Sequence, residues 1–129
     1  MDRRKMSERY QEIAKDLIET RDELEDLREA EISIICLASS HAKKKGDKLV
    51  FGQCEKVSEK YKWGIPCDFT ITVFEPNVVG FTDDQLKILI YHELLHIGVD
   101  DKRLFIKLHD LEDFKAIIDE FGTNWAEVN

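Results

Sequence analysis

Positive charge, cysteine and long apolar runs are all scarce in this sequence. Its 19 lysines and arginines are outnumbered by 27 aspartates and glutamates, which gives a net charge of -8. This balance argues against a general nucleic-acid binder, because phosphate contacts require clustered Lys and Arg. The 3 cysteines form no CxxC pair and are odd in number, so neither a disulfide framework nor a zinc ribbon is indicated. No apolar run approaches the roughly 20 residues of a membrane span, so no membrane partner is expected.

What the chain does contain fits one globular domain. Its 129 residues are enough to bury a hydrophobic core without disulfides, and 43% of them are apolar while 36% are charged. The opening stretch MDRRKMSERYQEIAKDL has no apolar segment of the kind found in secretory signals. We therefore expect a cytoplasmic protein with a single domain over residues 1–129, made of an N-terminal helix within 1–30 and a core within 31–122. No interdomain linker is indicated.

The N-terminal region predicts one long helix over residues 7–30. Its apolar side chains recur at helical spacing in a narrow stripe, namely Tyr10, Ile13, Leu17, Leu24 and Leu27. A narrow stripe is typical of a coiled-coil seam, so the helix could pair with another chain. The stripe is short, which favours packing across the protein's own sheet and leaves the oligomeric state open.

Three segments predict strands, at residues 31–39, 49–57 and 67–76. The third alternates, with Phe69, Ile71 and Val73 on one face and Thr70, Thr72 and Phe74 on the other. Pro76 should end it, because proline cannot donate to a ladder and is confined to edge strands or strand ends. We expect this strand at the edge of a small mixed sheet, and we expect the lysine-rich stretch between the first two strands to be a loop.

Residues 83–97 form the best-defined predicted helix. Thr82 and Gln85 make a capping box at its start, and Gly98 is the expected stop. Most of its side chains are apolar, so it should be buried on most sides. A second helix is predicted over 110–122, between Asp110 and Gly122. The expected fold is therefore α+β: an N-terminal helix, a small mixed β-sheet, the helix over 83–97 and a C-terminal helix.

The buried helix carries HELLH, which matches the HExxH motif. Side chains four residues apart lie about 5–6 Å apart at Cβ on one helix face. His92 and His96 can therefore converge on one Zn²⁺ ion at about 2.0–2.1 Å. Glu93, one step round the helix, is placed to act as general base on a water molecule that the metal activates. Five residues can match by accident, but two imidazoles on a mostly buried helix each need a hydrogen-bond partner or a metal, which favours zinc.

A catalytic zinc site needs a third protein ligand. Val99 and Lys102 stand where the metzincin arrangement requires Gly and His. His109 is favoured, because a short hairpin or loop after His96 could bring it back to the metal, whereas the alternatives Glu112 and Glu120 lack the usual gluzincin setting. Asp110 and Asp113 could each hold a ligand imidazole by its other nitrogen, with helix capping as the alternative role.

With these motifs in place, FTDDQLKILIYHELLHI followed by HDLEDF resembles the phage metallopeptidases, small zincin-like proteins of phages and prophages. The resemblance covers roughly residues 30 to 121. It implies a zincin-like fold with His92, His96 and His109 as zinc ligands and Glu93 as the catalytic acid and base. The ligand logic is similar to that of SprT-like proteases.

The sequence thus predicts a zinc-dependent metallopeptidase acting on a peptide or protein substrate, with one Zn²⁺ per chain. Two alternatives stay open: a non-catalytic, zinc-stabilised protein-binding module, and a regulatory protease specific for one repressor-like partner. An edge strand can bind an extended peptide by β-augmentation. The residues expected to align the substrate in this way are Thr70, Ile71, Thr72, Val73 and Phe74.

Overall fold

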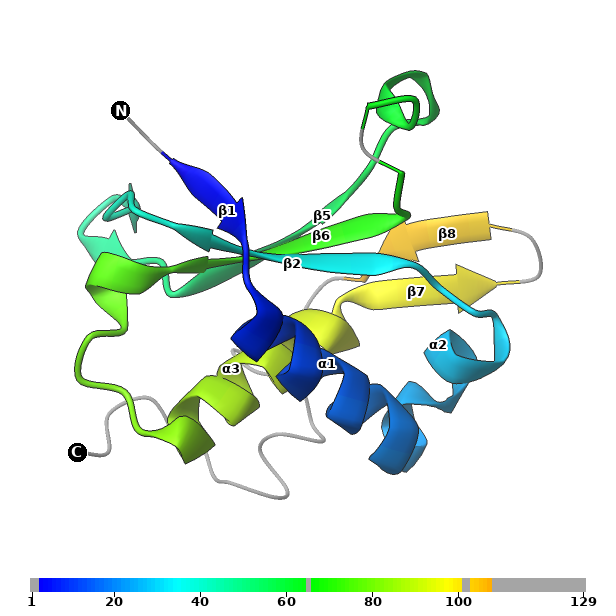
Figure 1. The fold of residues 1–129 in the computed structure, drawn as a ribbon, viewed down its shortest axis with the longest axis horizontal. Helices are drawn as coiled ribbons and strands as arrows, with labels where there is room; N and C mark the ends of the chain where they lie inside the picture. The colour runs from blue at the N-terminus through cyan, green and yellow to red at the C-terminus, as the bar shows by residue number, and fades with distance from the viewer. Residues whose placement is uncertain (1–2, 65, 101–102, 108–129) are drawn as a thin grey trace.

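A four-stranded mixed sheet with helices on one face forms the body of the protein. The computed structural model describes residues 3–64, 66–100 and 103–107 (Figure 1). The sheet order is β1-β2-β6-β5, from β1 (Arg4–Met6), β2 (Ile34–Ser39), β6 (Phe69–Phe74) and β5 (Gly52–Lys56). β2 and β6 run parallel, and the other two pairs are antiparallel. The α+β class and the small mixed sheet are confirmed, while the predicted helix over 110–122 lies outside the described residues.

The predicted edge position of β6 is wrong. β6 lies inside the sheet, where Ile34 to Ser39 of β2 pair with one side of it and Gly52 to Lys56 of β5 pair with the other. Pro76 falls in the 3-10 turn η3 (Glu75–Asn77) after the strand, so it limits the length of β6 and not its lateral position. The short strand β1, which the sequence did not predict, forms one edge, and β5 forms the other.

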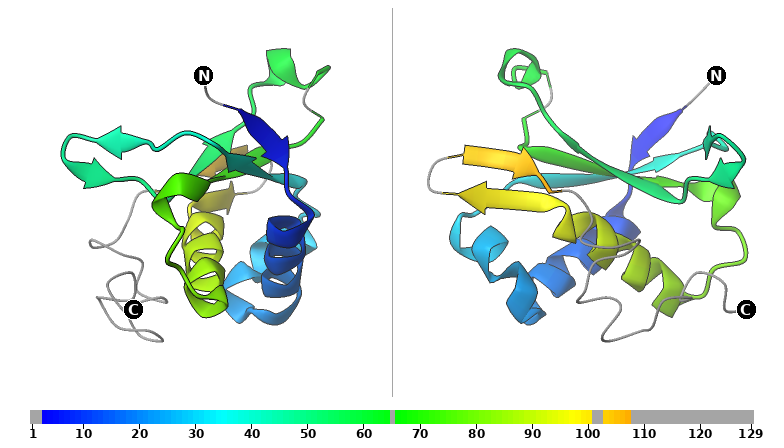
Figure 2. Two further views of the ribbon diagram at one scale, coloured as in Figure 1. Left: turned by 60° about the vertical axis from the view of Figure 1, so that its left-hand side comes forward. Right: turned by 180° about the vertical axis from the view of Figure 1, so that it is seen from behind.

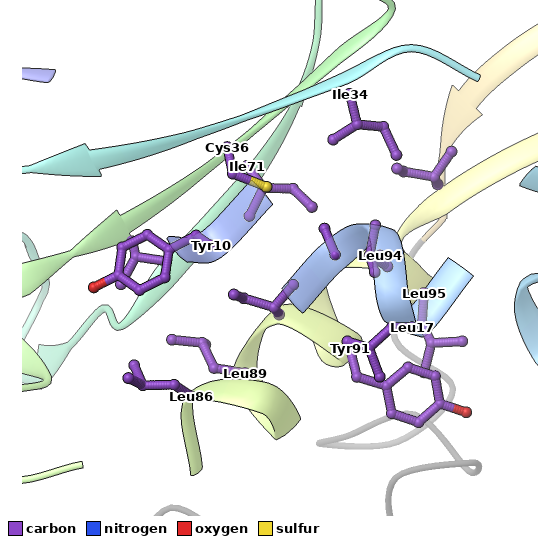
Figure 3. Packing of buried hydrophobic residues seen from close by; sticks show 14 of the residues in the cluster. Tyr10, Leu17, Ile34, Cys36, Ile71, Leu86, Leu89, Tyr91, Leu94 and Leu95 are labelled. Atoms are coloured by element: carbon purple, nitrogen blue, oxygen red, sulfur yellow. The ribbon is translucent and has the colours of Figure 1, made fainter. Parts of the chain in front are cut away.

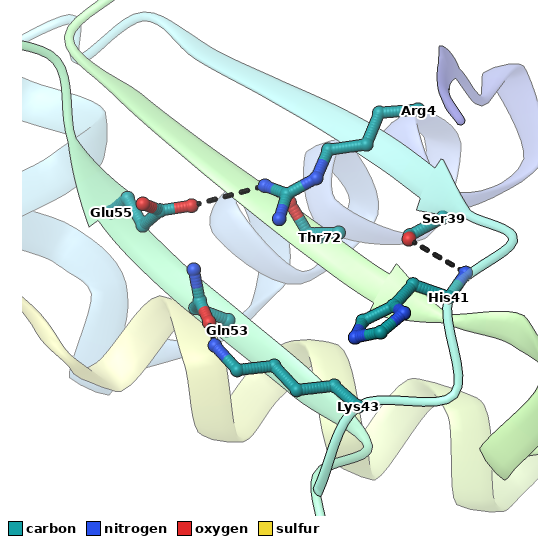
Figure 4. Close-up of polar contacts among 7 residues, drawn as sticks. All are labelled: Arg4, Ser39, His41, Lys43, Gln53, Glu55 and Thr72. Atoms are coloured by element: carbon teal, nitrogen blue, oxygen red, sulfur yellow. Dashed lines mark hydrogen bonds and ion pairs between the residues drawn. The ribbon is translucent and has the colours of Figure 1, made fainter. Parts of the chain in front are cut away.

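Long polar side chains cover the sheet face opposite the helices. Thr72 and Phe74 on this face are both 0% exposed. The Arg4 guanidinium contacts the Thr72 hydroxyl at 3.4 Å and the Glu55 carboxylate at 3.3 Å (Figure 4). The charged groups of Arg4 and Lys43 lie 5.8 Å and 5.5 Å from the Phe74 ring centroid. The alternating faces predicted for β6 are correct. The face that carries Thr72 and Phe74 is covered by Arg4 and Lys43 and is not exposed to solvent.

The helices form the second layer, on the other face of the sheet (Figure 2). α1 (Glu8–Thr20) packs against β2 and against α3 (Asp83–Leu95). Four residues of the predicted stripe are at most 3% exposed, namely Tyr10, Leu17, Leu24 and Leu27. The stripe therefore packs within the protein's own core (Figure 3), as favoured from the sequence.

The prediction of a single helix over 7–30 is wrong, because the helix breaks at Arg21. The backbone there is extended, with φ -96 and ψ 126, and the chain continues through a 3-10 turn η1 (Asp22–Leu24) and the short helix α2 (Glu25–Glu29). Arg28 donates to the main-chain oxygens of Ile18 and Glu19, which satisfies carbonyls at the end of α1. The break lets Leu24 and Leu27 reach the core along a bent path.

α3 begins as predicted and ends earlier. Thr82 and Gln85 form both bonds of the capping box. The helix ends at Leu95 with His96 as C-cap, and Gly98 belongs to a strand, so its predicted role as a helix stop is wrong. The strand β7 (Ile97–Asp100) pairs with β8 (Arg103–Ile106) in an antiparallel hairpin. Residues 101–102 between them lie outside the described part of the chain.

Two smaller features complete the architecture. The lysine-rich stretch expected to be a loop contains the strands β3 (Lys44–Lys45) and β4 (Lys48–Leu49), joined through Gly46 at φ +65. This left-handed conformation suits glycine. The 3-10 turn η2 (Glu59–Tyr61) lies between β5 and β6. Among the helices described, none is long and apolar enough to cross a membrane.

The core position of Leu17 gives a test of this packing. Leu17 is 0% exposed, so Leu17→Ala should lower the free energy of unfolding by about 2–5 kcal/mol through lost burial and a residual cavity. Val79 is 84% exposed, so the matched control Val79→Ala should change it by less than about 0.5 kcal/mol. Urea denaturation of both variants measures the difference. Equal stabilities would contradict an intramolecular role for the α1 stripe.

Candidate metal site beneath strand β5

The C-terminal half of α3 places two imidazoles side by side. The ring centroids of His92 and His96 are 5.2 Å apart, with an angle of 73° between the ring planes. Both residues are only partly buried. The four-residue spacing thus brings the two rings to one side of the helix, as the motif predicts.

The chain after the β7–β8 hairpin fixes the His96 ring. His96 Nδ1 lies 2.8 Å from the main-chain oxygen of Lys107, and the Lys107 N–H donates to the His96 oxygen at 2.5 Å. A carbonyl oxygen can only accept, so Nδ1 is the nitrogen that carries the proton. In the neutral ring, Nε2 then holds the lone pair that a metal requires. Metal-ligating histidines are held by carbonyls or carboxylates in this manner.

Glu93 lies beneath the edge strand β5. Its side chain is 5% exposed, and a methyl group added at Gly52 would lie 3.4 Å from Glu93 Cγ and 3.2 Å from Leu89 Cδ1. Cys54 is the next residue of β5 on this side. Burial is the largest cause of the raised pKa of its thiol, and the negative charge of Glu93 is the second. The Glu93 side chain is therefore held between α3 and the edge strand β5.

The donor set of the site suits zinc, which accepts imidazole nitrogen readily. Within residues 3–64, 66–100 and 103–107, no group of three or more His, Cys, Asp or Glu side chains is placed to hold a metal ion. His92 and His96 supply two donors. The other predicted site residues lie outside the described residues, namely His109, Asp110, Glu112, Asp113 and Glu120. They remain predictions.

The structure does not bring the predicted substrate strand to this site. Residues Thr70 to Phe74 belong to β6, whose main chain pairs with strands on both sides. An extended peptide has no unpaired backbone to join there. β5 lies between β6 and the edge of the sheet, and β8 lies close to β5. The prediction that the main chain of Thr70, Ile71, Thr72, Val73 and Phe74 aligns a substrate as an edge strand is therefore wrong.

Three residues near the site were missed from the sequence: Gly52, Cys54 and Lys107. A glycine inside a predicted strand often marks the close approach of another group, so Gly52 carried a usable signal. The proximity of Cys54 to Glu93 depends on sheet pairing, which no local pattern in the sequence predicts. All three cysteines are free, as expected, and burial raises the pKa of the Cys36 thiol to about 12.

The fold and the site together define a small α+β protein with paired imidazoles and a buried carboxyl group on one central helix. The family model described as "Putative phage metallopeptidase" matches residues 3–129. The chain belongs to this family, in agreement with the resemblance noted from the sequence. No curated protein and no solved structure matches the chain.

Proposed function

We propose that the protein is a zinc-dependent peptidase that uses Glu93 as general base. The observation that carries the proposal is the pairing of His92 with His96 beside the buried Glu93, with the His96 ring held by Lys107. Membership of the phage metallopeptidase family supports the reaction class and implies a metal.

The proposed zinc ligands are His92, His96 and His109. His109 is two positions beyond Lys107, whose main chain meets His96. The end of the hairpin therefore delivers the chain to the neighbourhood of the first two ligands, which supports His109 over the more distant Glu112 and Glu120. Zinc bound there would polarise the scissile carbonyl group and acidify a water molecule.

Glu93 is the proposed general base and general acid of the reaction. Its carboxylate accepts a proton from the attacking water as the new C–O bond forms. It then donates that proton to the leaving amine nitrogen as the C–N bond breaks. The confined position under Gly52 and Cys54 restricts the rotamers of the Glu93 side chain, and a fixed carboxylate serves this transfer better than a mobile one.

Strand β5 is the proposed docking edge for an extended peptide. Phe74 N donates to Phe51 O and Val57 N donates to Asp68 O at the two ends of the β5–β6 ladder. By antiparallel alternation, the main-chain groups of Gly52, Cys54 and Lys56 face away from β6. In the described part of the chain, β5 forms a ladder with β6 alone, and the hairpin strand β8 lies close to β5 without pairing with it. This edge lies directly above Glu93, so a peptide joined to it would pass the general base.

The first test of the proposal is metal content. In zinc-supplemented buffer the purified protein should carry one zinc ion per chain, since three histidines complete a site with one open position. His92→Ala, His96→Ala and His109→Ala should each weaken zinc binding steeply in chelator competition, while Glu112→Ala and Glu120→Ala should not. A wild-type protein that stays metal-free, or a carboxylate variant that loses zinc in place of His109→Ala, contradicts the ligand set.

The second test separates catalysis from a structural role of zinc. Glu93→Gln should keep zinc and fold but lower peptide cleavage by about 10²–10⁴-fold, because an amide cannot accept the water's proton. New N-termini in a proteome-derived peptide library, counted by mass spectrometry, compare the variant with wild type. Equal cleavage removes Glu93 from the mechanism. Zinc binding without cleavage by either protein favours the protein-binding module.

The third test concerns the docking edge. Lys56→Pro deletes one outward N–H donor of β5 and leaves its bonds to β6 intact, so peptide cleavage should fall while zinc affinity stays constant. Lys56→Ala is the matched control, because it loses the same side chain but keeps the N–H. If the two variants cleave equally well, the substrate does not use this edge.

A further inference from the structure

The ring of Phe105 occupies the space in which a side chain at position 98 would lie. Gly98 and Phe105 are direct partners in the β7–β8 hairpin. A methyl group built on Gly98 would lie 2.4 Å from Cε2, 2.5 Å from Cζ and 2.7 Å from Cδ2 of the ring. The Arg103 guanidinium lies 5.3 Å from the ring centroid. The Phe105 ring therefore packs directly against the main chain of Gly98, and the Arg103 guanidinium contacts the ring.

This contact marks one register of the hairpin. Ile97 pairs with Ile106, Gly98 with Phe105 and Val99 with Leu104. The next position outward brings Lys107 to His96, where the main-chain bond from Lys107 N to His96 O continues the ladder. A slip by one residue would set Phe105 opposite a residue with a Cβ and would move every side chain of β8 to the other face. The packing of Phe105 against Gly98 therefore disfavours such a slip.

The register in turn selects the carbonyl group that meets the His96 ring. In the observed pairing it is the oxygen of Lys107, 2.8 Å from Nδ1. A slip of one residue would move this oxygen away from the ring, and this oxygen is the acceptor that keeps the proton on Nδ1. It would also shift the chain from which His109 follows.

We infer that Phe105 and Gly98 are positioning residues for the metal site, acting on His96 through the hairpin register and the Lys107 carbonyl. The inference rests on the proposed function in so far as His96 binds a metal. The link from Phe105 to the protonated nitrogen of His96 concerns the metal-free protein and stands apart from catalysis.

The experiment measures the His96 tautomer and the zinc affinity in the same set of full-length variants. Nitrogen-15 NMR of the metal-free wild type at a pH where the ring is neutral should show the His96 proton on Nδ1. Gly98→Ala and Phe105→Ala should shift the population towards the Nε2–H tautomer. Both should weaken zinc binding in chelator competition by about 10- to 100-fold, the usual cost of losing a group that orients a ligand.

Controls separate positioning from general loss of stability. Gly80 has no neighbour within 4 Å of an added Cβ, so Gly80→Ala should change neither readout. Ile106 is 37% exposed and one residue closer to Lys107, so Ile106→Ala should keep the tautomer although it trims the same strand. Phe105→Tyr keeps the ring and should retain wild-type behaviour. In a Phe105→Ala background, Gly98→Ala should add little, because the clash has gone.

The outcomes distinguish this inference from the proposed function. A folded Phe105→Ala protein with an unchanged His96 tautomer and zinc affinity overturns the inference, whatever the protein cleaves. An equal effect from Ile106→Ala also overturns it, because proximity to Lys107 would then explain the result. If wild-type protein binds no zinc, the proposed function fails, and the tautomer measurement still decides whether Phe105 positions His96.

Discussion

The burial of α3 against the sheet and alongside α1 is the constraint on which the rest of the structure depends. The helix presents apolar side chains on nearly every side, and nine of its residues are buried. A helix of this kind cannot rotate or slide without exposing apolar surface or leaving space in the core. Its polar residues are consequently fixed in direction. His92 and Glu93 lie in the last turn of the helix and His96 is its C-cap, next to the β7–β8 hairpin.

Two further elements turn this fixed helix into a site. The edge strand β5 crosses above Glu93, and the absence of a side chain at Gly52 leaves room for the Glu93 stem and for Leu89. The hairpin that follows the helix returns the chain to His96. At Gly52 the absence of a side chain provides the space for Glu93. At Lys107 the main-chain carbonyl provides the acceptor for the His96 ring.

Local signals in the sequence predicted the elements well, and non-local pairing accounts for most of the errors. The Thr82–Gln85 capping box and the apolar stripe of α1 act over a few residues, so both could be recognised directly. The interior position of β6 depends on pairing with β2, and nothing in the segment itself distinguishes an edge from an interior strand once its outer face is covered by Arg4 and Lys43. The helix break at Arg21 depends on how Leu24 and Leu27 pack into the core, which is a non-local property. The motif predicted the paired histidines, whereas Gly52 meets Glu93, and Lys107 meets His96, only after the sheet and hairpin form.

The parallel pairing of β2 with β6 has a consequence for how the chain folds. Partners such as Ile34 and Phe69 are far apart in sequence, so the central pair of the sheet forms only after a long loop has closed, which is a slow and entropically costly event. The β7–β8 hairpin joins near neighbours such as Asp100 and Arg103, and hairpins of this size form within microseconds. The segment that orients His96 can thus be organised before the central pair of the sheet, on which α3 packs, is in place. His96 and Glu93 would therefore reach their native surroundings at different times during folding.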